Sequence, residues 1–114
     1  MRTKLVILLT AAAIAAATLG STSSDGATKR MYGTVGPGMT ITVSRHSVVH
    51  GRYVFTARDK SADHNFHLIG PGVNKKTTIS QVASKSWTIT LRPGTYHYVC
   101  DAHPVDMKGT FKVT

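Results

Sequence analysis

Three side chains that bind soft metals lie close together near the end of the sequence. Cys100, His103 and Met107 offer a thiol, an imidazole and a thioether within residues 100–107. The segments on both sides alternate as strands do, so this run is a loop that can turn all three donors toward one point. Thiolate and thioether favour copper over hard cations, and the set is typical of a trigonal His2Cys copper site with a long, weak Met bond. A second histidine must come from elsewhere in the chain.

The N-terminus has the pattern of an export signal. Arg2 and Lys4 form a short positive region, and the apolar run 5–19 is too short to span a bilayer comfortably. We interpret residues 1–20 as a secretory signal peptide with a cut somewhere in 17–27, the alternative being an uncleaved membrane anchor. We therefore expect a protein of the periplasm or the cell exterior, with no specific membrane insertion after signal cleavage.

The rest of the chain predicts a short leader and one domain. Residues 21–28 are rich in Ser, Thr, Gly and Asp, a composition typical of a flexible leader. Residues 29–114 can bury one core, so we expect one domain that is monomeric.

The cysteine count adds weight to the metal interpretation. Cys100 is the only cysteine in the sequence. An unpaired thiol in an oxidising compartment is liable to oxidation or to pairing between molecules. Three explanations are open, namely a buried inert thiol, a disulfide between two chains and a metal ligand. The neighbouring His103 and Met107 favour the metal ligand.

The charge of the chain indicates which partners to expect. Its formal net charge is +9 at pH 7. A basic surface attracts acidic partners or anionic surfaces over long range, although a solvated face that only confers solubility is an equal alternative. The cations are scattered and the chain carries an export signal, which argues against nucleic acid. We expect redox partner proteins, acidic ones among them.

Glycine and proline recur through the domain, and no apolar pattern of helical period lasts. The predicted strands are 31–35, 39–44, 52–58, 64–69, 87–91, 95–100 and 109–113. A polar crossing loop over 73–84 holds a short strand around 77–79, and His46 and His50 lie in a polar connection as exposed residues or an accessory metal site. Many short strands at near-regular spacing favour an all-β sandwich of two sheets.

Strand parity selects the missing histidine. Positions two apart along a strand share a face. His64 shares its face with the apolar Phe66, as Cys100 does with apolar residues of its own strand. His64 therefore points toward the core, whereas His67 points the other way with Asn65. His64 is the predicted ligand, and His67 is the alternative that a β-bulge before Phe66 would favour.

At these residues the sequence resembles the cupredoxins, specifically the small plastocyanin-like blue copper proteins. The resemblance rests on a His-Asn pair at 64–65, a Gly-Thr-Tyr-x-Tyr-x-Cys strand at 94–100, and a Cys-x2-His-x3-Met loop followed by Gly-x-Phe-x-Val. It covers nearly all of 29–114. It implies a Greek-key β-sandwich that carries one copper ion at one end and shuttles single electrons.

The resemblance also assigns roles to residues. It implies that His64, Cys100 and His103 are the equatorial ligands. Met107 becomes the axial ligand, and Asn65 ties the two ligand-bearing segments together in the second shell. The spacing between the loop histidine and methionine is one residue shorter than in plastocyanins and equals that of azurins, whose Cys-to-His gap is longer instead. This departure concerns the Met bond and the solvent access of the histidine rather than ligand identity.

The implied function is an exported one-electron carrier whose copper cycles between Cu(I) and Cu(II). We do not expect an enzyme, because the sequence offers one copper site, no second histidine cluster for oxygen chemistry and no nucleophile and base pair. One alternative is a copper chaperone or storage protein that uses the same residues. The other is a structural module with the site unused or filled with zinc, which is disfavoured because thioether is a poor zinc ligand.

Overall fold

The computed structural model describes residues 28–114, which form strands and connecting segments. The predicted signal peptide at 1–20 and the leader up to residue 27 lie outside the described residues. Within the described part of the chain, no helix is long and apolar enough to cross a membrane.

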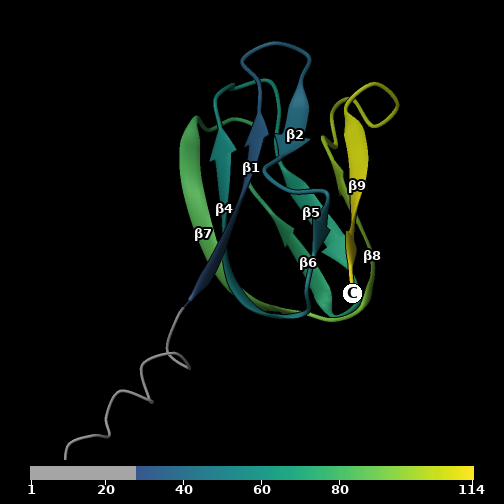
Figure 1. Cartoon of the computed structure of the whole chain (residues 1–114). Coiled ribbons are helices and arrows are strands. Elements are labelled where there is room, and N and C mark those ends of the chain that lie inside the picture. Colours follow the sequence, from purple (N-terminus) through teal and green to yellow (C-terminus); the bar gives the residue numbers. More distant parts are fainter. Residues whose placement is uncertain (1–27) are drawn as a thin grey trace, which may run out of the picture.

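The strands form two sheets that pack face to face (Figure 1). In chain order they are β1 (Lys29–Val35), β2 (Ile41–Val43), β3 (Ser47–Val48), β4 (Gly51–Asp59), β5 (His67–Gly70), β6 (Val73–Lys76), β7 (Ala83–Leu91), β8 (Gly94–Val99) and β9 (Lys108–Val113). One sheet has the order β2-β1-β4-β7 and the other β3-β9-β8-β5-β6. The pairs β1–β4 and β3–β9 are parallel, and the remaining pairs are antiparallel. The predicted all-β sandwich is confirmed.

Strand β4 shows why the sequence folds in this way. Tyr53, Phe55 and Ala57 are buried, whereas Arg52 and Arg58 on the opposite face are exposed. An antiparallel or mixed sheet with one apolar and one polar face must bury the apolar one. The same alternation in β8 and β9 supplies the opposing inner face.

Phe66 is the aromatic residue that joins the core to the segment carrying His64. Its ring is fully buried, lying 5.6 Å from the ring of Phe55 in one sheet and 5.8 Å from the ring of Tyr98 in the other. The ring also covers Gly33, where an added Cβ would come within 2.3 Å of Phe66 Cζ. Burying a phenylalanine contributes roughly 1.5–3 kcal/mol, so this contact anchors the segment firmly.

The predicted strand at 64–69 differs from the observed one, because β5 begins only at His67. The backbone N–H of Asn65 donates to Cys100 Sγ at 3.5 Å, and that of Phe66 donates to Thr77 Oγ1 at 2.9 Å. These groups therefore bind side chains rather than a neighbouring strand. Strand parity does not apply here, and Asn65 is 2% exposed instead of facing outward.

The crossing loop also differs from its prediction. The predicted strand at 77–79 is wrong, since the strand β6 lies earlier and pairs with β5. Gly72, with φ of 71°, allows the tight turn that closes this hairpin. Strand β3 was not predicted, because its two residues gain their partners only from β9 at the end of the chain.

Candidate metal centre

His64, Cys100 and His103 converge at one end of the sandwich, where the loop between β8 and β9 lies (Figure 1). Their ligand atoms all lie within 4.8 Å of one another. Cys100 Sγ is 3.8 Å from Nδ1 of His64 and 3.8 Å from Nδ1 of His103. Two segments that are distant in sequence, the one before β5 and the loop after β8, thus present one thiol and two imidazoles to a single point.

The 100–107 loop is closed by its own main-chain hydrogen bonds. Cys100 N–H donates to the carbonyl of Met107 at 2.9 Å, and Met107 N–H donates to the carbonyl of His103 at 3.0 Å. His103 N–H in turn donates to the carbonyl of Cys100 at 3.0 Å. These bonds bring the loop ends together and direct His103 back toward the thiol.

The cluster is largely buried, and one of its three side chains is partly exposed to solvent. Cys100 is fully buried and His64 is 4% exposed, whereas His103 is half-buried. The two imidazole rings meet edge to face, with centroids 4.8 Å apart. Gly36, at a φ of 74°, brings the turn between β1 and β2 within 3.5 Å of the His64 ring, measured from an added Cβ. An added Cβ there would clash with Ser61 Cβ at 2.9 Å.

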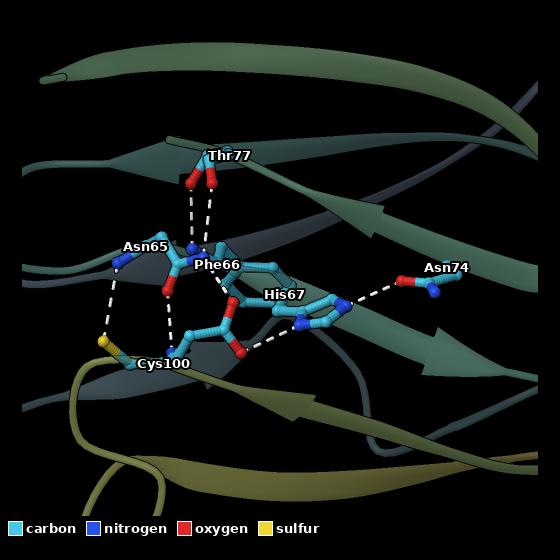
Figure 2. Close-up of polar contacts among 7 residues, drawn as sticks. Asn65, Phe66, His67, Asn74, Thr77 and Cys100 are labelled. Carbon is cyan, nitrogen blue, oxygen red and sulfur yellow. Dashed lines mark hydrogen bonds and ion pairs between the residues drawn. The ribbon is translucent and has the colours of Figure 1, made fainter. Parts of the chain in front are cut away.

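Asn65 links the two segments that carry the cluster. Its side-chain Oδ1 accepts a hydrogen bond from the backbone N–H of Asp101 at 2.8 Å. Its Nδ2 donates to Asp101 Oδ2 at 2.9 Å and to the carbonyl of Thr77 at 3.2 Å. Its backbone N–H points at Cys100 Sγ (Figure 2). Asn65 thus joins the segment that carries His64 to the residue after Cys100.

A buried carboxyl group, that of Asp59, also supports the segment that carries His64. Asp59 is 3% exposed and accepts hydrogen bonds from Ser61 N–H at 3.1 Å and from the Thr77 hydroxyl at 3.1 Å. Burial raises the pKa of Asp59, and the two hydrogen bonds and the charge of the nearby His64 offset this only partly. Thr77 also accepts the Phe66 N–H, so Asp59 helps to hold the backbone next to His64.

The alternative ligand His67 lies outside the cluster. Its Nδ1 is 2.9 Å from Asp101 Oδ1, and its Nε2 is 2.7 Å from Asn74 Oδ1. Both ring nitrogens therefore have other partners, and His64 is the histidine that the fold brings to Cys100.

His46 and His50 are both exposed. Nδ1 of His46 faces the carbonyl of Thr110 at 3.5 Å, and Nδ1 of His50 faces that of Thr114 at 2.9 Å. Neither belongs to the group of ligand atoms found among residues 28–114. Met107 is 1% exposed, and its role as an axial ligand stays a prediction.

Sequence reasoning missed three residues of this region, namely Asp59, Thr77 and Asp101. Asp59 carried a signal, because it continues the inward parity of Tyr53, Phe55 and Ala57 and is thus a polar residue on the core face. Thr77 and Asp101 carried none, since their partners are set by long-range packing.

The donor set and its spacing fit a metal ion. With bonds of about 2.3 Å to thiolate and about 2 Å to imidazole, and angles of about 110° to 120° between them, sulfur and nitrogen around one ion lie about 3.5 to 3.7 Å apart. The two sulfur-to-nitrogen distances of 3.8 Å are close to this range. A thiolate with two imidazoles in this geometry favours copper, whereas carboxylate and carbonyl oxygens suit the hard cations.

Comparisons with known proteins agree with this fold. No protein-family model and no curated protein sequence matches the chain. Among solved structures, the chain is similar to the Cu(I) form of an amicyanin variant, with 22% identity, 81% of this chain and 89% of that chain covered, and a TM-score of 0.55. It is similar to an oxidised amicyanin variant (25% identity, 79% and 84% covered, TM-score 0.52) and to the copper protein rusticyanin (21%, 78% and 79%, 0.56).

The chain therefore has the cupredoxin fold, and a His-Cys-His group that could hold one metal ion lies at one end of it. The fold expected from the sequence resemblance is confirmed.

Proposed function

We propose that this protein is an exported type 1 copper protein that carries single electrons, its one copper ion cycling between Cu(I) and Cu(II). His64, Cys100 and His103 would hold the ion, and Met107 would be a weaker fourth ligand. The observation that carries the proposal is the placement of the Cys100 thiol 3.8 Å from Nδ1 of both histidines in a buried position. Export rests on the sequence pattern of residues 1–20.

The way the donors are held suits electron transfer. A one-electron carrier must change oxidation state with little rearrangement, although Cu(I) and Cu(II) prefer different geometries. Here the segments that carry the three donors are held by packing and by hydrogen bonds between protein groups. The loop closes on itself through Met107, and the Asn65 N–H is directed at Cys100 Sγ. This rigidity supports an unchanging ligand geometry in both oxidation states.

His103 is the natural point of electron entry and exit. It is the half-buried member of the group, whereas His64 and Cys100 are buried. Val105 in the same loop is 75% exposed, so a partner protein can approach this end closely. The basic character of the chain favours an acidic redox partner.

Electron transfer fits the site better than catalysis. Within residues 28–114, His64, Cys100 and His103 form the one group of three or more His, Cys, Asp or Glu residues with ligand atoms close together. Copper binding requires Cys100 as thiolate and both histidines deprotonated at the coordinating nitrogen, so acid will release the ion.

Redox titration of protein loaded with one equivalent of copper tests the proposal. We expect a reversible one-electron couple, electron exchange with a soluble redox protein, and copper retained through repeated cycles. Cys100→Ser, which keeps the size of the side chain but removes the thiolate, should abolish the couple. Transfer of Cu(I) to an added chelator faster than electron exchange would instead identify a copper chaperone or storage protein.

A further inference from the structure

A chain of polar contacts leads from His67 to the thiol of the candidate metal centre. His67 Nδ1 lies 2.9 Å from Asp101 Oδ1, and Asp101 Oδ2 accepts a hydrogen bond from Asn65 Nδ2 at 2.9 Å. Asn65 Oδ1 accepts the Asp101 backbone N–H at 2.8 Å, so these two residues are joined at two points. The Asn65 backbone N–H then points at Cys100 Sγ at 3.5 Å (Figure 2).

The ring of His67 is fixed between two oxygen atoms. Asp101 Oδ1 faces Nδ1, and Asn74 Oδ1 faces Nε2 at 2.7 Å. Carboxylate and amide oxygens are acceptors, so a ring N–H that faces either oxygen can donate to it. The His67 side chain is 15% exposed and belongs to β5, which pairs on both sides. The strand thus aims the ring at Asp101.

Other charged or titratable groups near the ring lie on the neighbouring strands. Lys76 of β6 pairs directly with His67, whereas the residue that pairs with His67 from β8 is the uncharged Val99. His97 of β8 is opposite Ile69 and is therefore a diagonal neighbour. Asp101 is the one acidic group among these contacts.

Asp101 is held as a carboxylate by these surroundings. Partial burial by itself would raise the pKa of Asp101, but hydrogen bonds from His67 and Asn65 and the positive charges of His67 and Lys76 hold this pKa below its ordinary value. Asn65 and Asp101 also line an open hollow of about 550 Å³, so this side of their contact faces solvent.

We propose that His67 is a positioning residue for Cys100, acting through Asp101 and Asn65 to hold the N–H group that faces the thiolate. The proposal rests on the proposed function as a copper carrier. Hydrogen bonding around the cysteine sulfur tunes the potential of such a site. A network that keeps the N–H on sulfur stabilises the thiolate's electron density and favours Cu(I), so loosening it lowers the reduction potential.

The first test uses the metal-free protein and measures the rate at which iodoacetamide alkylates Cys100. This thiol is fully buried, so alkylation reports local opening of the surrounding segment. We expect His67→Ala to react about tenfold faster than wild type, because it loses one charge-assisted hydrogen bond that holds the segment closed. His67→Gln, whose amide can still donate to Asp101, should stay closer to wild type. His97→Ala, on the neighbouring strand, is the matched control and should not change the rate.

The second test separates positioning from a purely structural role, using copper-loaded protein. Loosening the N–H group that faces the sulfur lowers the potential, so His67→Ala should have a lower reduction potential than wild type and a shifted thiolate-to-copper band. His67→Gln, whose amide can still donate to Asp101, should stay close to wild type in both, and His97→Ala should change neither. Asp101→Asn should shift both in the same direction as His67→Ala, and the double variant His67→Ala/Asp101→Asn should be non-additive.

The outcomes distinguish the two proposals. If His67→Ala alkylates no faster than His97→Ala, or if copper-loaded His67→Ala keeps the wild-type band and potential, the positioning role is wrong while the copper carrier stands. If the wild-type protein forms no blue site, the carrier proposal fails, and the alkylation rates of the metal-free variants still decide whether His67 positions Cys100.

Discussion

Two pairs of loop histidines occur in this domain, and only one pair is arranged to bind a metal. His64 and His103 present Nδ1 to a buried thiol, whereas His46 and His50 are exposed and present Nδ1 to main-chain carbonyls. His50 lies beside the C-terminus, at the end of the sandwich away from the loop between β8 and β9 (Figure 1). As residue types the two pairs are alike, because all four residues are histidines in connecting segments.

The difference lies in what surrounds the rings. Next to His64, the packing of Phe66 against Phe55 and the hydrogen bond between Asn65 and Asp101 hold the backbone that carries the ring. Around His50, one hydrogen bond holds a ring that is otherwise in solvent. A ligand set is thus defined by the rigidity and direction of its donors more than by its residue types.

The largest expected effect is a difference in copper affinity between variants of the two histidine pairs. His64→Ala removes one of the two proposed imidazole ligands, so the apparent copper affinity should fall by more than the roughly 10–100-fold that loss of an outer-shell partner costs. The double variant His46→Ala/His50→Ala should bind copper as wild type does. Competition against a chelator of known affinity measures both. Equal losses in the two variants would contradict the assignment of the site to His64.

A second prediction concerns the packing that holds His64. Gly33→Ala places a Cβ 2.3 Å from Phe66 Cζ, so the ring must shift, and we expect a loss of about 1–3 kcal/mol in unfolding free energy. Gly38→Ala is the control, because an added Cβ there meets nothing within 4 Å, and it should change stability by less than about 0.5 kcal/mol. Urea denaturation of the metal-free proteins compares them. Similar stabilities for the two variants would show that Phe66 adapts without cost.

The smallest expected effect is a pH dependence. Burial raises the pKa of Asp59 above its ordinary value of 3.8, so the folded state binds this proton more tightly than the unfolded state. Stability from this group is present at low pH and is lost as pH rises from the ordinary value through the raised folded value. Asp59→Asn should remove that decline, and Asp63→Asn, at an exposed carboxylate, should keep it. Denaturation at a series of pH values measures the slope, and a slope unchanged in Asp59→Asn would rule out this role.

The fold and the centre of the site could be predicted because their signals are local. Alternation in β4, β8 and β9 identified the inner faces, and the spacing of Cys100, His103 and Met107 identified the loop. The structure brings His64 rather than His67 to Cys100, although the segment 64–66 is not a strand.

The remainder depended on contacts between distant segments. The N–H groups of Asn65 and Phe66 pair with Cys100 and Thr77, so no local pattern could indicate that β5 begins at His67. The pairing of His67 with Asp101 joins positions 34 residues apart and was equally invisible. Long-range hydrogen bonds of this kind decide how the site is supported, which sequence periodicity does not report.

The most direct test of the central claim is the combined visible and paramagnetic resonance spectrum of the wild-type protein with one equivalent of Cu(II). A trigonal site with a thiolate ligand predicts an intense thiolate-to-copper charge-transfer band in the visible region and an unusually small copper hyperfine splitting. A colourless complex with the spectrum of tetragonal copper would contradict the account, because the Cys100 thiolate would then not be a ligand.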